Sequence, residues 1–421
     1  MTALALRGAQ DIHFLSNIDL TVFRILYRRH TNFQIGELVM PFQSNATFGR
    51  NRITGQLQRS GDLLAAVYLY VLLDQITYTV PGNYDPTVPN AAWYVDAIGH
   101  AMLLDQDITI GHTEFDDQNG EYLELHDCLM APPEKLLHEM SGHAETDGQL
   151  MSNSLNQQHL YIPFRFWFSK WIEQALPMVA LYWHDVNVNL STRPIAQLVK
   201  YAGAITSADV TVPADPLDMH MLCNYVYLDR AERAAFANGK HEYLFEQMQF
   251  LGEVAHPSTE ATNNINIRFN HPVNELIWVC QQDAKIASLD WFDFSGKSTS
   301  SLHPVVTTFD VPQDPFLTGQ IELNNHDRTI EHPAQYYRTV QPYQAHSRFP
   351  HRWVYCYSFS THPEGLLDSG SVNFSRMDSA FLRLTFPTDA VLGWTGQVRV
   401  YARSKQVAKV NAGMMGVKYG G

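Results

Sequence analysis

The sequence contains few cysteines, and none of them is spaced for a metal or redox motif. Its 421 residues include four cysteines, Cys128, Cys223, Cys280 and Cys356. No two of these are separated by only two residues, which argues against zinc ribbons and thioredoxin-like redox sites. Cys280 and Cys356 lie in apolar runs, where a free thiol behaves as a small hydrophobic group. We therefore expect reduced cysteines and a cytosolic or nuclear setting.

The chain also lacks an excess of positive charge and a long apolar run. Lys plus Arg total 29 against 43 Asp plus Glu, a net charge of −14. This sign is wrong for a protein that coats nucleic-acid phosphates, so we expect no direct nucleic-acid partner. The longest apolar stretch, Leu63 to Leu73, is about half the roughly 20 residues that a membrane-spanning helix needs. Residues 1–11 show no basic leader before an apolar core, so we expect no signal peptide.

Sequence signatures of enzymes are missing as well. There is no G-x-S-x-G elbow, P-loop or dinucleotide fingerprint. His138 to His143 resembles the H-E-x-x-H zinc motif, but its second histidine comes one residue too late and would lie about 140° around a helix from the first. Gly142 would also end a helix there, so we expect a solvated loop. The sequence predicts no enzyme, no catalytic residue, no bound cofactor and no metal ligand.

Two further polar clusters have simple structural interpretations. Glu114, Asp116 and Asp117 could offer oxygen ligands to calcium, but no EF-hand spacing follows, so we expect a surface acidic loop. His326 and Asp327 follow Asn324 and Asn325, a pair suited to a tight turn whose flanking residues are exposed.

What the sequence does contain is one set of strand patterns that occurs twice in the same order. The landmarks of the first half are Asp107–Thr113, Leu160–Phe168, Asp185–Ser191 and Asn224–Leu228. Those of the second half are Gln320–Arg328, Trp353–Phe359, Phe381–Phe386 and Val398–Ala402. Alternation of apolar and polar residues, as in Asn264–Asn270, is typical of strands with one wet face. Two all-β units built to one plan are the simplest explanation.

The connections between these strands divide the chain. Asp229–Ala237 is a predicted helix that begins with a capping aspartate and stops before Asn238 and Gly239. Two prolines in Val210–Pro216 are not expected in a central strand, so we place the boundary between the units near Ala214. The predicted organisation is an amino-terminal arm (1–25), a first unit (26–213) and a second unit (214–421). Antiparallel strands with frequent turns suit jelly rolls and other sandwiches equally.

Several segments in fixed order resemble the major capsid proteins of nucleocytoplasmic large DNA viruses. These segments are Gly8–Asp11, Thr21–Phe33, Arg59–Leu63, Tyr225–Phe236, His241–Phe250, Arg268–Pro272 and Val372–Asp378. The resemblance implies an all-β fold of two consecutive eight-stranded antiparallel jelly-roll sandwiches with short helices in the connections. It also implies a structural coat protein that forms pseudo-hexagonal homotrimeric capsomers of an icosahedral shell.

The same resemblance implies partners and a location. The expected partners are further copies of the chain, neighbouring capsomers and minor capsid proteins, the last through the amino-terminal arm. An inner viral membrane would be an indirect partner. The expected location is the virion shell, after synthesis and assembly in the host cytoplasm or nucleus. The loop Ser295–Thr308 would project outward, so it should tolerate an epitope inserted near Thr299.

A carbohydrate-binding or carbohydrate-active sandwich is the alternative. Aromatic side chains crowd residues 164–171, and aromatic platforms bind sugars, although burial in a core or at a subunit seam accounts for them better. Arg28 and Arg29 could touch lipid headgroups, but an ion-pairing or capping role is favoured. The sequons at Asn45, Asn189 and Asn373 are not expected to receive ordinary glycans without a signal peptide, and the predicted strands at Asn189 and Asn373 further indicate chance matches.

Overall fold

The structure is a computed structural model that describes residues 23, 27, 29–79, 91–131, 138–203, 205–296, 314–388 and 394–419. Apart from residue 23, the predicted arm (1–25) lies outside the described residues. The same holds for Arg28 and for the predicted insertion site near Thr299.

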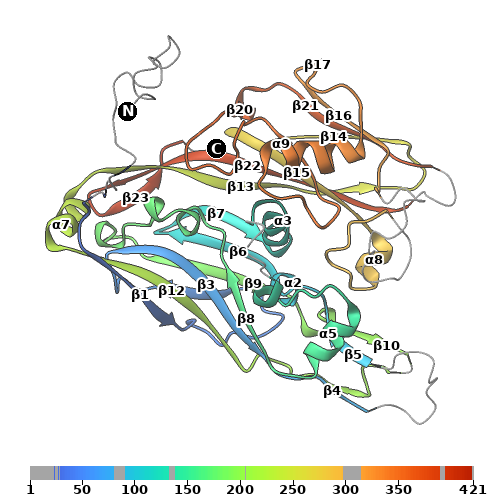
Figure 1. The fold of residues 1–421 in the computed structure, drawn as a ribbon, viewed down its shortest axis with the longest axis horizontal. Helices are drawn as coiled ribbons and strands as arrows, with labels where there is room; N and C mark the ends of the chain where they lie inside the picture. The colour runs from blue at the N-terminus through green and yellow to red at the C-terminus, as the bar shows by residue number, and fades with distance from the viewer. Residues whose placement is uncertain are drawn as a thin grey trace, which may run out of the picture.

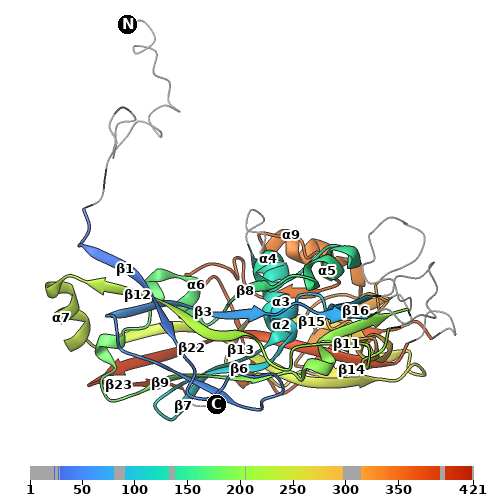
Figure 2. The same cartoon turned by 90° about the horizontal axis from the view of Figure 1, so that it is seen from below.

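The described chain forms two β-sandwich units that lie side by side along their length. In Figure 1 the first unit, coloured blue to green, lies below the second unit, coloured olive to red. Figure 2 shows that the strands of both units run along the long axis of the molecule. All strand pairs are antiparallel within the described residues. The predicted all-β architecture is therefore confirmed.

Two four-stranded sheets make up the first unit. The first sheet has the order β1 (Phe33–Met40), β12 (Asp218–Leu228), β3 (Leu63–Leu73) and β8 (Gln158–Pro163). The second sheet has the order β2 (Ile53–Leu57), β9 (Val186–Thr192), β6 (Leu103–Ile110) and β7 (Thr113–Asn119).

The second unit repeats this plan. Its first sheet has the order β13 (His241–His256), β22 (Gly396–Asn411), β15 (Pro272–Gln282) and β19 (Tyr355–Ser358), with β20 (Val372–Asn373) and β23 (Met414–Val417) attached. Its second sheet has the order β14 (Thr262–Asn266), β21 (Ala380–Thr385), β16 (Thr318–Leu323) and β17 (His326–Asp327), with β18 (His332–Pro333) attached. Each unit is thus an eight-stranded jelly roll in which the last long strand of the unit lies between its first and third strands.

Side-chain alternation explains why the longest apolar run is a strand and not a helix. In β3 the side chains of Val67, Leu69 and Val71 are buried, whereas the intervening Tyr68 and Tyr70 are partly exposed. This period of two places one face of the strand on the core and the other outward. None of the helices in the described part of the chain is both long enough and apolar enough to cross a bilayer.

The aromatic stretch after β8 departs from the prediction. We expected a strand over Leu160–Phe168, but β8 ends at Pro163 and the short helix α6 (Trp167–Lys170) follows. Proline cannot donate to a ladder, so it is a natural last residue for the strand. Phe164, Phe166 and Phe168 are nevertheless buried, because the turns after the strand fold back into the core.

The strand that follows the predicted boundary near residue 214 pairs with strands of the first unit. Residues 214–217 precede β12, and β12 pairs with β1 and β3 in the first unit. The proline-rich stretch instead contains β11 (Val210–Thr211), which pairs with β4 (Thr77–Tyr78) in a two-stranded ladder at the edge. The helix α7 (Arg230–Asn238) then leads into β13. It was predicted from its sequence, and the side chain of Asp229 accepts the N–H of Arg230 at its start as expected.

The other helices belong to the connections. In the first unit they are α2 (Ile98–Ala101), α3 (Gly120–Met130), α4 (His138–Ser141) and α5 (Asp147–Ser154), near the small ladder of β5 (Ala91–Tyr94) and β10 (Val199–Ala202). In the second unit they are α8 (Asp283–Ala287), the π-helical turn η5 (Tyr336–Val340) and α9 (Gln341–Ala345). The helix α3 follows β7 directly, and η5 and α9 occupy the equivalent place after β17.

Candidate functional site: the junction and its exposed counterparts

The two units meet where β7 and α3 of the first unit pack against β13 and β22 of the second (Figure 1). The start of α3 is fixed by Asn119, whose side chain accepts the N–H of Tyr122. A Cβ atom on Gly120 would lie 2.1 Å from the carbonyl oxygen of His100, so only glycine fits there. This close approach holds α3 against α2 and aims its other face at the second unit.

Apolar contacts form one end of the junction. The ring of Phe115 in β7 lies 5.8 Å from that of Phe245 in β13, and Trp167 lies 5.0 Å from Phe245. These three rings are buried. Aromatic groups contribute large apolar area at such a contact, so they supply non-directional attraction between the units.

Asp116 is buried in this contact and accepts the backbone N–H of Met248 at 2.9 Å. Burial raises the pKa of Asp116 to about 8, despite that hydrogen bond and one from Gln118. Burial and the neighbouring Asp105 raise the pKa of Asp117 to about 7. The predicted surface acidic loop is therefore wrong at Asp116. These residues form the edge strand β7, and β13 of the second unit covers Asp116.

Polar contacts continue the junction along β22. The hydroxyl of Tyr401 donates to Glu121 at 2.9 Å and accepts from the side-chain amide of Asn119 at 3.1 Å. Arg399 forms an ion pair with Glu121 at 2.6 Å. Burial raises the pKa of Glu121, and the charge of Arg399 opposes this effect. A tyrosine and an arginine on one strand therefore hold the first turn of α3.

Arg403 is the centre of a buried ion network beside α3. Its guanidinium contacts Glu275 at 2.7 Å and Glu246 at 2.5 Å. His346 lies 3.0 Å from Glu275. Burial alone would raise the pKa of Glu275, but His346 and Arg403 outweigh it and lower the pKa to about 2. Buried ion pairs are costly to remove from water, and once formed they fix the positions of the strands that carry them relative to one another.

A second buried network joins the units through Arg352. This second-unit side chain contacts Asp96 at 2.8 Å and Glu124 at 2.6 Å, both in the first unit. Burial would raise the pKa of both carboxyl groups, but Arg352 holds both values well below their usual range. His143 also contacts Asp96, at 2.7 Å, and its side chain is only 8% exposed. The predicted solvated loop is therefore wrong at His143, because Asp96 and Arg352 draw the ring into the junction.

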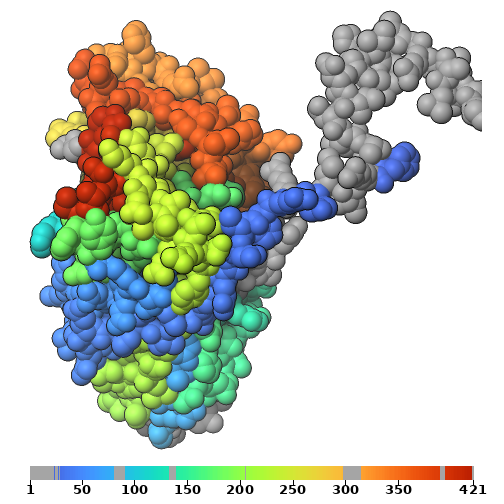
Figure 3. All heavy atoms as spheres, turned by 90° about the vertical axis from the view of Figure 1, so that its left-hand side faces the viewer, coloured from blue at the N-terminus to red at the C-terminus, as the bar shows by residue number. Residues whose placement is uncertain are grey.

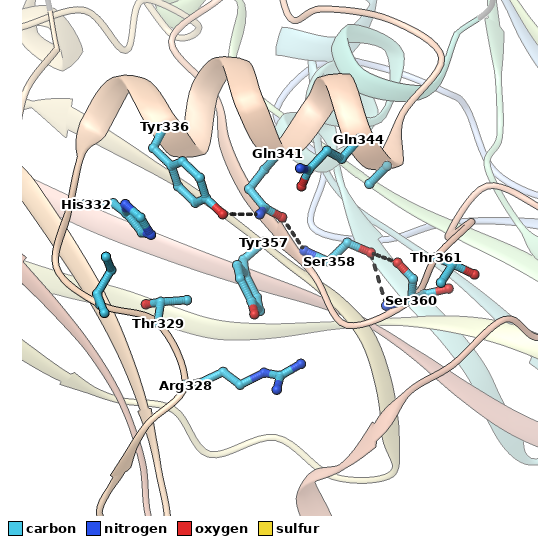
Figure 4. Close-up of a pocket in the computed structure, with 12 residues that line it drawn as sticks. Arg328, Thr329, His332, Tyr336, Gln341, Gln344, Tyr357, Ser358, Ser360 and Thr361 are labelled. Carbon is cyan, nitrogen blue, oxygen red and sulfur yellow. Dashed lines mark hydrogen bonds between the residues drawn. The ribbon is translucent and has the colours of Figure 1, made fainter.

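The second unit presents an open surface at the place equivalent to the β7–α3 side of the junction. We define the β17–α9 face as residues 326–349 of the second unit. Ile330 is 70% exposed, Tyr343 76% and Phe349 55%. A hollow of about 610 Å³ lies between α9, η5 and the segment after β17. Figure 4 shows its polar lining, in which Gln341 links Tyr336 to the backbone N–H of Ser358.

The first unit presents an open surface at the place equivalent to the β13–β22 side. We define the β1–β8 face as the outward side of the sheet β1-β12-β3-β8. Phe33, Ile35 and Val39 of β1 are 54%, 52% and 58% exposed on this side. Tyr70 stacks on His220 at 4.6 Å and lies 5.1 Å from Tyr161. Figure 3 shows β1 at the surface beside β12 and α7.

The remaining residues singled out in the sequence lie apart from the junction. His326 and Asp327 are exposed after a turn in which Asn324 and Asn325 have φ angles of 51° and 60°, which confirms the tight turn. Asn189 is buried in β9 and donates to Asp107, whereas Asn45 and Asn373 are exposed. Arg29 is exposed, and the side chain of His138 lies outside the described residues.

The aromatic platform required by the carbohydrate alternative is not formed by residues 164–168. Phe164, Phe166, Trp167 and Phe168 are each at most 3% exposed, and only Trp171 of this group reaches the surface, at 37%. The predicted burial in the core is confirmed for these four. All four cysteines are free and buried, as expected from their surroundings.

Comparison with known proteins agrees with the division seen in the sheets. A family described as "Major capsid protein N-terminus" matches residues 21–229, and one described as "Large eukaryotic DNA virus major capsid protein" matches residues 232–416. The border between the two matches falls at the start of α7.

Individual relatives match over nearly the whole chain. The major capsid protein of Paramecium bursaria Chlorella virus 1 is 31% identical over 100% of this chain and 99% of its own. That of Phaeocystis pouchetii virus is 29% identical over 98% of both chains. A chain of a quasi-atomic model of the PBCV-1 virus capsid superposes with a TM-score of 0.77 at 26% identity, over 95% of this chain and all of that one.

Proposed function

The chain belongs to the family of major capsid proteins of large eukaryotic DNA viruses, and from this premise we propose how its copies join. As a member of this family it is a structural protein of the virion shell that assembles with further copies of itself, and it is not an enzyme. We propose that its assembling unit is a homotrimer with a near-hexagonal outline.

The observation that supports the trimer is the repetition of the two junction surfaces. Inside the chain, the β7–α3 side of the first unit meets the β13–β22 side of the second. The counterparts of these sides are the β17–α9 face of the second unit and the β1–β8 face of the first. Both carry exposed apolar groups. A contact between these two faces in different copies would repeat the internal junction, so each copy would bind the next head to tail.

Threefold closure follows from the number of units. If each internal junction and each junction between copies turns the chain by a similar angle, six units complete a ring when three copies have joined. Six similar sandwiches then form a near-hexagonal capsomer, which can tile an icosahedral shell through weaker contacts with neighbouring capsomers.

The exposed row on β1 provides part of the driving force. Phe33, Ile35 and Val39 are about half exposed, and covering them would contribute about 1 kcal/mol each at 25 cal/mol per Å² of apolar surface. The strand β1 is also the edge of its sheet, and natural proteins protect long apolar edges by covering them. A second copy of the chain would provide that cover.

We also propose a revised division of the chain and the finer partners. The first jelly roll extends through β12 to residue 229, and the second begins after α7. The arm (1–25) would contact minor capsid proteins and neighbouring capsomers, and through these proteins an inner membrane would be an indirect partner. Synthesis and assembly would take place in the host cytoplasm or nucleus, which the reduced cysteines suit.

Light scattering on the purified chain tests the trimer. We expect the wild-type chain to have the mass of three copies at micromolar concentration. We expect the Ile35→Asp trimer to dissociate, because the variant places a charge in the row on β1 that the next copy would cover. The matched control is Leu155→Asp, an equally exposed leucine after α5 and far from β1. A wild-type chain that remains monomeric would contradict the proposal, as would equal dissociation of both variants.

A further inference from the structure

Three potential metal ligands from both units meet beside Arg352. Glu124 and Cys128 lie one turn apart on α3, so their side chains share one face of the helix. His351 comes from the segment before β19 in the second unit. Glu124 and Cys128 are buried, whereas the side chain of His351 is 32% exposed. The three donor atoms lie within 4.8 Å of one another.

The distances between the donor atoms are close to those of a bound metal site. Cys128 Sγ lies 3.9 Å from Glu124 Oε1 and 3.7 Å from His351 Nε2, and the last two atoms are 3.9 Å apart. Bonds of about 2.0–2.3 Å in a tetrahedral zinc site place the ligand atoms roughly 3.3–3.6 Å from one another. Side-chain shifts of a few tenths of an ångström would therefore bring all three atoms onto one ion.

We propose that Glu124, Cys128 and His351 form a binding site for a divalent transition-metal ion, best matched by zinc, that joins the two units of one chain. Thiolate, imidazole and carboxylate are the donors that zinc prefers, and their mixture is unsuited to calcium or magnesium. Three protein ligands leave the fourth tetrahedral position to a water molecule. The exposed side of His351 provides the route by which the ion enters.

Surrounding groups support this arrangement. His100 Nδ1 lies 2.7 Å from Glu124 Oε2, and Arg352 Nε lies 2.6 Å from Glu124 Oε1, so the carboxylate is held from two sides. Such partners orient a metal-binding carboxylate. The same network holds three carboxylates (Asp96, Glu124 and Asp127) and two guanidinium groups (Arg165 and Arg352).

Binding can be written as a balanced exchange. The thiol of Cys128 loses its proton to solvent, and its sulfur forms a bond to the ion, while the neutral imidazole and the ionised Glu124 each donate a lone pair. No electron transfer is involved. The ion would link α3 to the second unit independently of any contact between copies, so the proposal does not depend on the trimer.

The test is metal analysis of the purified full chain. The protein is saturated with Zn²⁺, freed of loosely bound ion by a weak chelator, and analysed for zinc per chain; a parallel sample receives Co²⁺. We expect about one ion per chain and a thiolate-to-cobalt absorption band, because sulfur is a ligand. Both signals should be lost in Cys128→Ser and in His351→Ala. Since His351 is partly exposed, its variant should fold even if Cys128→Ser does not.

The controls are variants of the same residue types elsewhere. Cys280→Ser changes another buried cysteine and His326→Ala an exposed histidine, and both should retain the ion and the band. The proposal is overturned if the wild-type chain takes up neither ion, or if it binds zinc without the cobalt band. Retention of the ion in His351→Ala would overturn it equally.

Discussion

The β7–α3 side of the first unit and the β17–α9 face of the second occupy equivalent places, yet their side chains differ in kind. The β7–α3 side buries Asp116, Glu121 and Glu124 and satisfies them with a backbone amide or an arginine. The β17–α9 face instead presents Ile330 and Tyr343 to solvent around a polar hollow.

The difference reflects where the partner of each surface comes from. The partner of the β7–α3 side is on the same chain, so the two surfaces meet at high effective concentration. Buried ion pairs there fix the angle between the units even though their removal from water is costly. The β17–α9 face must stay soluble until another chain arrives. Exposed charges on this face, such as Arg328 and Glu331, keep it soluble, while exposed Ile330 and Tyr343 offer apolar area to the later contact.

The strongest test of this contrast removes Arg352 from the junction. Arg352→Met leaves Asp96 and Glu124 of the first unit without their shared cation in a buried site, so we expect the free energy of unfolding to fall by about 3–5 kcal/mol. Urea denaturation of the purified chain measures this change. The control is Arg383→Met, whose ion pair with Glu322 is partly exposed and should contribute less than about 1 kcal/mol. Equal losses would mean that the junction network is no stronger than a surface pair.

The apolar end of the junction should be nearly as sensitive. Phe245→Ala would leave a cavity between Phe115 and Trp167, and we expect a loss of about 3 kcal/mol in the same measurement. Leu244→Ala is the matched control, since the neighbouring side chain on β13 is 42% exposed, and its effect should stay below about 1 kcal/mol. A larger loss of unfolding free energy in Leu244→Ala than in Phe245→Ala would show that the outer side of β13, and not its junction side, contributes most of the packing energy.

The pH dependence of stability should reveal the raised pKa of the buried Asp116 carboxyl group. Its pKa is about 8 in the folded chain against about 3.9 when unfolded, so the unfolded state releases its proton first as the pH rises. The stability contributed by Asp116 is therefore greatest below pH 4 and falls by at most about 1.4 kcal/mol per pH unit up to pH 8.

The isosteric Asp116→Asn should remove this slope. The free energy of unfolding of the variant should therefore rise relative to that of the wild type as the pH increases from 4 to 8. Asp327→Asn, at the exposed equivalent edge strand, should leave the slope as it is. Parallel curves for wild type and Asp116→Asn would exclude a buried protonated carboxyl group at this position.

The smallest effect on the folded chain is expected at the β17–α9 face. Ile330→Ser should change the free energy of unfolding of the monomer by no more than about 0.5 kcal/mol, because the side chain is 70% exposed. The same change should weaken trimers by about 1 kcal/mol if this face is covered by the next copy. Sedimentation over a concentration series separates the two quantities, and an unchanged dissociation constant would place the contact elsewhere.

Local signals in the sequence predicted much of the fold. The alternation of Ile265 with polar neighbours predicted β14, the Asn324–Asn325 pair predicted the β16–β17 turn, and Asp229 predicted the start of α7. These features depend on residues close together in the chain. The pairing of β12 with β1 depends on distant residues, so the sequence alone did not place this strand in the sheet of the first unit.

The junction itself could not be predicted from the residues alone. Asp116 looks like one of several exposed acids, and only the packing of β13 over β7 shows that it is buried. Cys128 and His351 are 223 positions apart, and no spacing motif relates them. The helical spacing of Glu124 and Cys128 was the one available signal, and pairs at that spacing are common in helices that bind nothing.

The position of the last long strand in each jelly roll has a consequence for synthesis on the ribosome. Because β22 lies between β13 and β15, these two strands cannot be joined until residues 396–411 have emerged. A nascent chain interrupted before residue 396 would leave both strand edges open to chaperones and proteases. Limited proteolysis of ribosome-stalled chains would compare those that end before residue 396 with those that end after residue 411. The longer chains should be the more resistant to cleavage. Synthesis past residue 411 thus acts as a quality check, since chains that lack β22 also lack the strand that holds the first turn of α3.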